Sequence, residues 1–257
     1  PTPFTEDGHV DLDSIGRVAE FCIKSGAAGL VFPGVASEYD FLDANERHSL
    51  LERICTVAAG RVPVVCGAGK GDAQQLRDNL QQSRALGVVA TMVLVPARFQ
   101  HDVEGALAFV QEIVNGRQDV AIILQNAPAP IGAGLGIDEV MRIVNAIDSI
   151  RFVKEECLPS GPRITGIREQ ANGNLIGVIG GGGGRYLIDE MARGAVAAMP
   201  AAEITDLHVR MWNAFAHGDA AKARELYMKT LPLLVIQATY RMRLTKWVLA
   251  KRGLLNN

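Results

Sequence analysis

One lysine of this sequence lies where a buried lysine could react with a carbonyl group. Residues 150–157 read IRFVKEEC, an apolar run that ends in a charged cluster. This pattern is typical of a buried strand whose carboxyl end opens on a site. There Lys154 would be partly desolvated, and a lysine that loses its proton readily can attack a carbonyl carbon and form a Schiff base. The sequence therefore predicts imine chemistry at Lys154.

Two glutamates follow Lys154 directly. Because side chains alternate along a strand, Glu156 should share a face with Lys154, and Glu155 should point the other way. Glu156 is then the predicted acid or base beside the lysine. Alternatively, Glu156 only forms a structural ion pair with Lys154 or with an arginine, since charged pairs at strand ends also serve stability alone. The pattern leaves both interpretations open.

Strands and helices are predicted to alternate along most of the chain. Short apolar runs rich in β-branched residues predict strands, and apolar residues three and four positions apart predict helices. One predicted helix begins with Asp43 as its N-cap and Glu46 as the capping-box partner. The predicted strands are 27–34, 62–67, 88–95, 120–125, 150–156, 175–179 and 195–199, and the predicted helices are 11–25, 43–59, 72–86, 103–114, 137–147, 163–171 and 186–193.

Apolar strands, each followed by an amphipathic helix, predict a parallel sheet covered by helices. With an eighth strand implied before Pro1, we expect an α/β fold, a closed (β/α)8 TIM barrel whose first strand is short or clipped. An open doubly wound sheet is disfavoured, because the first βα turn, residues 2–8, lacks the phosphate-binding glycines usual in that fold.

After Pro200 the sequence predicts helices only, at 204–217, 220–230 and 232–252. The chain is therefore expected to consist of a barrel, residues 1–203, and C-terminal helices, residues 204–257, packed on the barrel. The apolar residues 233–236 are expected to form a broad surface for that packing or for an oligomer contact.

The composition favours a small molecule as the partner. A net charge of -2 and a pI near 6.3 create no long-range field that would attract nucleic acid or an anionic membrane. No signal peptide is recognisable, and no apolar run approaches the roughly 20 residues that span a bilayer. The four cysteines are widely spaced and form no CxxC pair. We expect a cytoplasmic protein without nucleic-acid or membrane partners and without a metal site.

Residues at the carboxyl ends of the strands are the candidates for the site of a barrel. Of the seven lysines, only Lys154 and Lys70 fall in such segments. Lys70 lies in the glycine-rich loop 67–71, beyond the rigid strand, so Lys154 is preferred. Five glycines at 180–184 would let a ligand approach the backbone and would point amides at an anion. Among the strand-end segments, Gln125, Asn126, Gly181 and Gly182 are predicted to bind substrate.

Three motifs carry a resemblance to a known family. The segments GVASEYDFLDANER at 34–47, QNAP at 125–128 and FVKEE at 152–156 resemble, in order and spacing, the dihydrodipicolinate synthase and N-acetylneuraminate lyase superfamily. The resemblance covers nearly the whole chain. It implies a homo-tetrameric or homo-dimeric barrel in which Lys154 forms a Schiff base with a small 2-oxo acid such as pyruvate, without another cofactor. It also implies that the amides of Ala36 and Ser37, with the Ser37 hydroxyl, hold the substrate carboxylate.

The departures from the family pattern concern proton transfer. Where the family has a strand-five tyrosine as acid/base, this chain has Gln125, which cannot carry a proton. The threonine and tyrosine of the synthase proton relay correspond to Ala36 and Arg98, and an arginine that holds the second substrate corresponds to Pro130. These changes argue against the synthase reaction and leave imine chemistry with a different acid/base.

One branch of the superfamily fits the departures better. Ser-Glu-x-x-x-Leu at 37–42, Gln125 and Met199-Pro200 look more like the enzymes that dehydrate 2-keto-3-deoxy sugar acids, such as 2-keto-3-deoxyarabonate dehydratase. Once Lys154 has formed an iminium with the 2-oxo group, the C3 proton becomes acidic and the C4 hydroxyl can leave. Dehydration is therefore the expected reaction. Retro-aldol cleavage or condensation with pyruvate is the alternative.

Two further classes stay open. A phosphosugar isomerase or lyase would use the glycines at 180–184 to bind phosphate and would form no imine. A catalytically inactive barrel retained for binding would explain the missing tyrosine, although an intact Lys154 argues against it.

Overall fold

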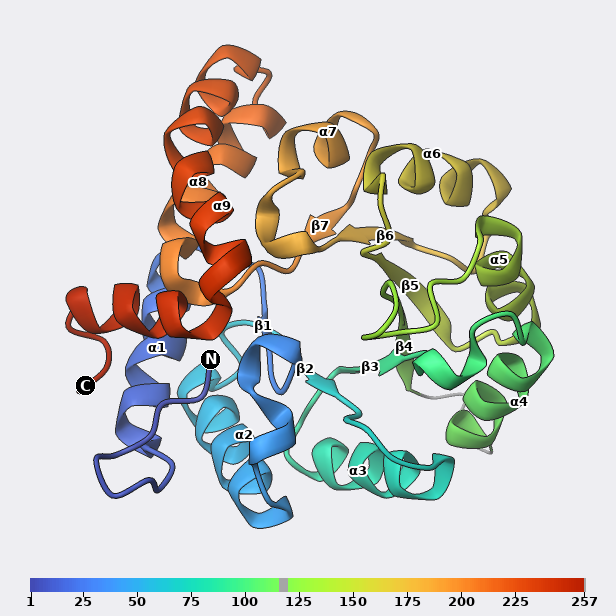
Figure 1. Cartoon of the computed structure of the whole chain (residues 1–257), viewed down its shortest axis with the longest axis horizontal. Coiled ribbons are helices and arrows are strands. Elements are labelled where there is room, and N and C mark those ends of the chain that lie inside the picture. The colour runs from blue at the N-terminus through green and yellow to red at the C-terminus, as the bar shows by residue number, and fades with distance from the viewer. Residues whose placement is uncertain (116–119, 257) are drawn as a thin grey trace. The chain divides into compact units, whose positions relative to one another are not determined.

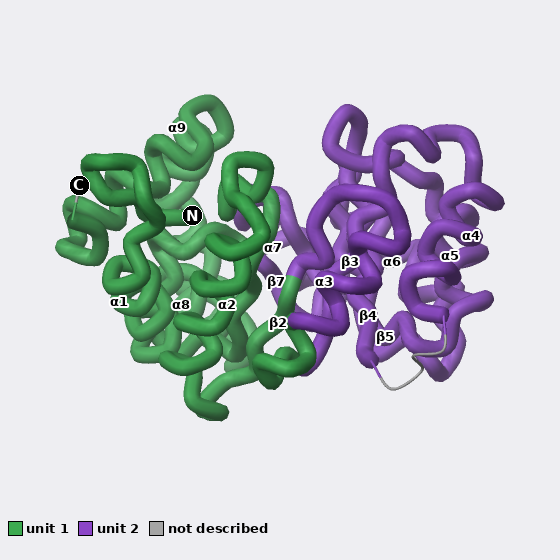
Figure 2. Tube along the Cα trace, turned by 90° about the horizontal axis from the view of Figure 1, so that it is seen from below, with its two compact units in different colours: residues 1–66, 83–88, 200–257 green, residues 67–82, 89–199 purple. Residues whose placement is uncertain are grey.

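The computed structural model describes residues 1–115 and 120–256 and divides the chain into two compact units (Figure 2). Unit 1 comprises residues 1–66, 83–88 and 200–257, and unit 2 comprises residues 67–82 and 89–199. Lys154 belongs to unit 2. The sequence predicts another division, into a barrel at residues 1–203 and helices at residues 204–257, and this division stays a prediction.

Unit 2 is built on a parallel sheet with helices on its outer side (Figure 1). Neighbouring strands in the sheet are consecutive in the chain, which requires a crossover helix after each strand. The strands are β3 (Ala90–Leu94), β4 (Ala121–Asn126), β5 (Ile150–Glu155), β6 (Gly177–Gly180) and β7 (Ala197–Ala198). The helices are α4 (Val103–Val114), α5 (Ile137–Ala146), α6 (Ser160–Gln170), α7 (Leu187–Ala192) and most of α3 (Ala73–Ala85), with the 3-10 turns η3 (Ala97–Phe99) and η4 (Gly182–Gly184).

The core of unit 2 fills the layer between sheet and helices. Val93, Ile122, Leu124, Ile150 and Val153 from the strands are fully buried. They pack with apolar residues of the helices, among them Leu80, Val110, Ile143 and Ile164. Burial on both faces explains why the strands read as continuous apolar runs in the sequence.

Unit 1 combines segments from both ends of the chain. It holds α1 (Leu12–Lys24), β1 (Leu30–Val31), η1 (Val35–Ser37), η2 (Tyr39–Phe41), α2 (Ala44–Ala58), most of β2 (Val64–Gly67), η5 (Ala202–Ile204), α8 (Thr205–Ala216) and α9 (Ala220–Lys251). β1 and β2 pair in parallel. Helix α2 begins with the predicted capping box, in which the Asp43 carboxylate accepts from the Glu46 amide and Glu46 accepts from the Asp43 amide.

The C-terminal helices differ from the prediction. The sequence predicts a break before Pro232, but α9 runs through Pro232 and leaves helical dihedrals only at Arg241, with φ 46° and ψ -122°. A proline removes one amide donor, and buried Leu234 and Gln237 hold the helix beyond it. Residues 233–236 do not form one surface. Leu234 is fully buried, whereas Val235 and Ile236 are exposed, because successive helical residues point in different directions.

Three smaller differences concern element length. β1 and β7 have two residues each, and α6 begins at Ser160, three residues before its predicted start. Ser160, in the first turn of α6, donates a buried hydrogen bond from its hydroxyl to Glu190 of α7. Among the helices of the described residues, none is long and apolar enough to cross a bilayer.

Candidate active site

Lys154 lies at the carboxyl end of β5, inside unit 2. In the parallel register it stands opposite Gln125 of β4 on one side and Ile179 of β6 on the other. Its side chain is only 10% exposed. Burial disfavours a charged ammonium, while a nearby carboxylate stabilises it. The lysine therefore sits in the environment that the sequence predicts for it.

Glu156 is the carboxylate beside Lys154. Its Oε1 lies 3.3 Å from the Lys154 Nζ, and its Oε2 accepts a 2.5 Å hydrogen bond from the Gln125 Nε2. The Glu156 amide continues the ladder by donating to the Asn126 carbonyl oxygen, which keeps strand alternation beyond the end of β5. Lys154, Glu156 and Gln125 thus form one polar cluster, which we call the lysine cluster.

Glu155 points to the opposite side and is fully buried. Its Oε2 accepts from Arg163 of α6 at 3.1 Å and from the Asn126 Nδ2 at 3.0 Å, and its Oε1 accepts from the Cys157 amide at 2.7 Å. A buried carboxylate that is paired and fully hydrogen-bonded holds the β5–α6 connection together.

Asn126 faces that structural network and not the lysine cluster. Besides its bond to Glu155, its Nδ2 donates to the Leu135 carbonyl oxygen, and its Oδ1 accepts from the Leu135 amide. The side chain is completely buried, and both ends of its amide are engaged within the protein. The predicted contact between Asn126 and substrate therefore has no support in this geometry.

The glycines after β6 make room for two glutamates. A Cβ at Gly181 would lie 2.7 Å from the Glu156 Oε1, and a Cβ at Gly180 would lie 2.8 Å from the Cδ of Glu190. Both distances are shorter than real Cβ contacts allow. Two carboxyl groups pack against this segment and would repel a phosphate group. Helix α7 has six residues and is too short to attract phosphate strongly through its helix dipole. The geometry thus speaks against the phosphate-binding alternative.

Glu190 is the residue that sequence reasoning missed. It lies in α7 with no exposed surface, and its Oε1 accepts a 2.7 Å hydrogen bond from the Ser160 hydroxyl. Burial, reinforced by the charges of Asp189 and Glu156 and opposed by the Ser160 hydrogen bond, raises the pKa of Glu190 to about 7. The sequence could not predict the burial and raised pKa of Glu190, because a glutamate in a predicted helix is usually exposed. Its burial depends on how α7 packs against α6 and β6.

The predicted carboxylate-binding loop belongs to unit 1. Ser37 is buried in η1, where its hydroxyl accepts from the Gly34 amide at 3.0 Å and its own amide donates to the Gly34 carbonyl oxygen. Thr2 donates to the Ser37 carbonyl oxygen at 2.6 Å. Ala36 beside it is partly exposed. The Ser37 amide, which is predicted to face the substrate, therefore donates to the Gly34 carbonyl oxygen within this loop.

The residues that depart from the family pattern are not candidates for proton transfer. Arg98 is exposed and stacks its guanidinium over the rings of Phe99 and Phe109. Pro130 is exposed as well.

Burial raises the pKa of the nearby Cys157 thiol to about 12, so Cys157 stays protonated and does not compete with Lys154 as a nucleophile.

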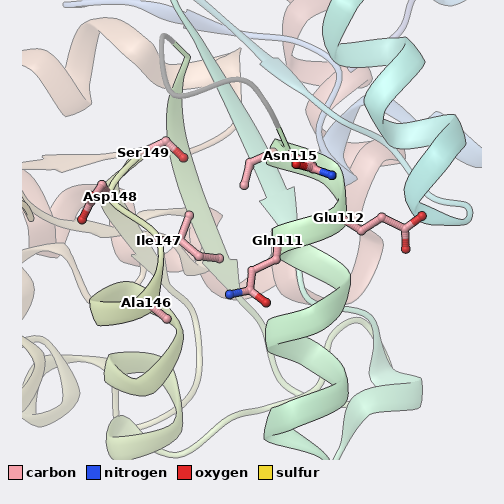
Figure 3. A pocket seen from close by; sticks show the side chains of 8 residues that line it. Gln111, Glu112, Asn115, Ala146, Ile147, Asp148 and Ser149 are labelled. Carbon is pink, nitrogen blue, oxygen red and sulfur yellow. The ribbon is translucent and has the colours of Figure 1, made fainter.

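A separate hollow of about 450 Å³ opens between the ends of α4 and α5 (Figure 3). Its lining includes Gln111, Asn115, Asp148 and Ser149. Ser149 directly precedes β5, so the hollow lies at the amino end of that strand, away from Lys154. No group of His, Cys, Asp and Glu side chains within the described residues could hold a metal ion.

Comparison with known proteins gives consistent matches along the chain. Residues 1–257 match the profile of the Dihydrodipicolinate synthetase family. The 4-hydroxy-tetrahydrodipicolinate synthase of a Prochlorococcus marinus strain is 27% identical over 234 residues, which cover 90% of this chain and 76% of that protein. The synthase of the same name from a Synechocystis strain is 28% identical over 244 residues, 91% of this chain and 77% of that protein.

The solved structures agree. A crystal structure of dihydrodipicolinate synthase from Rhodopseudomonas palustris has a TM-score of 0.92 and 28% identity, and the match covers 100% of this chain and 87% of that one. This likeness confirms the α/β fold class, a TIM barrel with C-terminal helices. The relatives carry synthase names, so the comparisons do not support the predicted sugar-acid dehydratase branch. This chain belongs to the dihydrodipicolinate synthetase family, within the superfamily of lysine Schiff-base lyases.

Proposed function

We propose that this protein is a lyase that forms a Schiff base between Lys154 and a 2-oxo acid such as pyruvate, and that it makes or breaks the C3–C4 bond, one carbon away from the imine carbon C2. One observation carries the proposal: the buried Lys154 Nζ lies 3.3 Å from a carboxylate oxygen of Glu156 at the carboxyl end of β5. The names of the relatives, which are synthases, support the carbon-carbon reaction over dehydration.

The lysine cluster contains the groups that imine formation needs. The neutral amine of Lys154 attacks the C2 carbonyl carbon, and the carbonyl oxygen leaves as water. Glu156 takes the ammonium proton and can return a proton to the departing oxygen, since its carboxylate lies within reach of the Lys154 Nζ. No cofactor is required for this step.

The same carboxylate can serve the carbon-carbon step. In the cleavage direction, Glu156 removes the proton of a C4 hydroxyl, the C3–C4 bond breaks, and its electron pair moves into an enamine on Lys154 while an aldehyde leaves. The enamine then takes a proton at C3, and water hydrolyses the imine to release pyruvate. Condensation is the reverse sequence. Gln125 cannot exchange a proton, but its hydrogen bond to the Glu156 Oε2 fixes the orientation of the carboxylate.

Dehydration of a 2-keto-3-deoxy sugar acid is the second candidate, and one observation favours it. Gln125 stands where the family acid/base tyrosine is expected, and its side chain is bonded to Glu156. In this reaction Glu156 removes a C3 proton from the iminium, and the C4 hydroxyl leaves as water. Both candidates require one base beside Lys154, and they differ in the substrate atom that faces it.

Several expectations stay with this proposal. Ala36, Ser37, Gly181 and Gly182 are the proposed substrate-binding residues, with Gln125 as a contact near the imine. A homo-dimer or homo-tetramer and a cytoplasmic location are the assembly and place that we expect for the enzyme.

Borohydride trapping tests the central claim. The protein is incubated with pyruvate and sodium borohydride, digested, and analysed by mass spectrometry. The expected result is the mass of reduced pyruvate on the peptide that contains Lys154, with no adduct in Lys154→Met and an unchanged adduct in the control Lys70→Met. An adduct on Lys70, or no adduct at all, overturns the proposal.

Product analysis separates the two candidate reactions. With a 2-keto-3-deoxy sugar acid, cleavage releases pyruvate and an aldehyde, whereas dehydration releases water and a 2-oxo acid of unbroken chain. Proton NMR of the mixture distinguishes them directly. A parallel assay with pyruvate and aspartate semialdehyde tests the synthase reaction itself, for which Ala36, Arg98 and Pro130 predict slow or absent turnover.

A further inference from the structure

Two carboxyl groups flank the glycine pair that ends β6. Glu156 packs against Gly181, and Glu190 packs against Gly180, so that a side chain on either glycine would collide with the corresponding glutamate. Glu156 reaches this place from the end of β5, and Glu190 reaches it from α7. Only the backbone of Gly180 and Gly181 separates the Glu156 carboxylate from the completely buried carboxyl group of Glu190.

The surroundings of Glu190 favour the neutral form of its carboxyl group. Its Oε1 accepts from the Ser160 hydroxyl, whereas its Oε2 has no hydrogen-bond partner among the residues that the structure describes. A buried carboxylate with one unsatisfied oxygen is strongly disfavoured. A protonated carboxyl leaves no charge buried, and this agrees with the pKa of about 7 that burial and the neighbouring charges give Glu190.

The charged groups around Glu190 do not neutralise it. On its own helix, the Asp189 carboxylate pairs with Arg193 at 2.9 Å. From α6 it receives only the neutral hydroxyl of Ser160, and from β5 it faces the negative Glu156. From the end of β6 it meets backbone alone, where the Gly181 amide opposes the rise of the Glu190 pKa. No cation in the described part of the chain pairs with Glu190, so a charge on it would act on Glu156.

We infer that Glu190 is a positioning residue, whose neutral carboxyl keeps a second negative charge away from Glu156 and Lys154 and whose ionisation slows imine formation. This inference rests on the proposed function of Lys154. A second negative charge behind the glycine pair would repel the Glu156 carboxylate and disturb the position that it holds beside Lys154. Nothing in the sequence motifs around Lys154 indicates this control, because Glu190 acts through Glu156 and touches no substrate.

The test compares the pH dependence of imine formation in three forms of the full chain. The rate of cyanoborohydride trapping of pyruvate on Lys154 is measured from pH 6 to pH 8 for wild type, Glu190→Gln and the control Asp189→Asn. The amide oxygen that Glu190→Gln introduces can still accept from Ser160, so this variant imitates the neutral acid. Asp189→Asn removes the same charge one residue away, where the carboxylate is half exposed and paired with Arg193.

The ratio of the Glu190→Gln rate to the wild-type rate is expected to rise severalfold across this range, with a midpoint near pH 7. The corresponding ratio for Asp189→Asn should stay constant. Ser160→Ala should move the midpoint to higher pH, because it removes the hydrogen bond that favours the Glu190 carboxylate. A merely structural glutamate would change the rate equally at every pH.

The outcomes separate the two proposals. If no form is trapped on Lys154, the Schiff-base function itself fails. If wild type is trapped but the Glu190→Gln ratio does not change with pH, the positioning role of Glu190 is wrong while the function stands. Should Glu190→Gln fold poorly, the ratio of the Ser160→Ala rate to the wild-type rate decides the matter alone: this ratio should rise above pH 7, and a ratio that does not change with pH overturns the inference.

Discussion

Gly181 and Glu156 fit together so closely that a Cβ on the glycine would stand 2.7 Å from a carboxylate oxygen of the glutamate. The backbone at Gly181, with φ -132° and ψ -129°, lies outside the left-handed region. The glycine is therefore required chiefly by the space that Glu156 occupies.

Gly181→Ala should displace Glu156 from Lys154 and lower turnover on a 2-oxo acid at least tenfold, because the carboxylate would lose its position near the reacting groups. Gly173→Ala is the matched control, since a Cβ there meets nothing within 4 Å. Steady-state kinetics and circular dichroism of both variants check the effect. Full activity in Gly181→Ala would mean that Glu156 can move without harm and is no acid/base.

Glu156→Gln should leave borohydride trapping of Lys154 measurable while turnover falls by roughly 10²- to 10⁴-fold, the usual contribution of a positioned acid/base. The measurement pairs trapping yield with steady-state rate in one preparation. Normal turnover would exclude Glu156 from proton transfer. Loss of trapping together with turnover would mean that the carboxylate is needed for imine formation, by proton transfer or by holding Lys154 in place, and not for the carbon-carbon step alone.

Glu190→Gln should stabilise the protein at alkaline pH. Because the pKa of Glu190 is raised in the fold, from 4.5 to about 7, wild type loses stability as the pH rises between these values. The variant should lack that loss, and its advantage should grow by about 2–3 kcal/mol from pH 4 to pH 8. Urea unfolding at several pH values measures it, and a difference independent of pH would contradict the assignment.

Arg163→Met should destabilise the protein by about 3–5 kcal/mol, because it leaves the fully buried Glu155 carboxylate without its cation. Arg142→Met is the comparison, since Arg142 pairs with Glu104 on the surface and should contribute less than about 1 kcal/mol. Chemical denaturation of both variants checks the contrast. Equal effects would show that the Glu155 network is not the stabilising element described above.

Arg241→Gly should stabilise α9 by about 1 kcal/mol, because its φ of 46° and ψ of -122° suit glycine and strain other residues. Arg243→Gly, two residues on in regular helix, should cost about as much. Thermal unfolding of the two variants gives opposite shifts in Tm if this holds. Shifts in the same direction would show that the kink at Arg241 stores no strain.

The sequence predicts well whatever depends on neighbours along the chain. Alternation placed Glu156 beside Lys154 and Glu155 on the other face, and the Asp43 capping box began α2 where expected. The bonds of Asn126 to Glu155 and Leu135 could not be predicted from the sequence, because pairing between strands and loops sets them.

Packing decides the features that local patterns could not give. The burial of Glu190 depends on α6, α7 and β6 together, and its hydrogen bond with Ser160 joins the first turn of α6 to α7. In α9 the sequence predicts a break at Pro232, whereas the helical dihedrals are interrupted at Arg241. A positive φ at an arginine has no signature in the sequence, so the position of the kink could not be predicted.

The composition of unit 1 has a consequence for the order in which the chain folds. Arg17 of α1 donates to the Leu254 carbonyl oxygen and to the Asn256 side chain, and Asn256 donates to Asp11. These contacts join residues more than 200 positions apart, so they cannot form on the ribosome until residue 256 has been synthesised. Unit 2, which ends at residue 199, is available much earlier. During translation the part that carries Lys154 should gain its structure first, while the face of α1 that holds Val18 and Cys22 waits for Leu249 and Leu255, which complete its core.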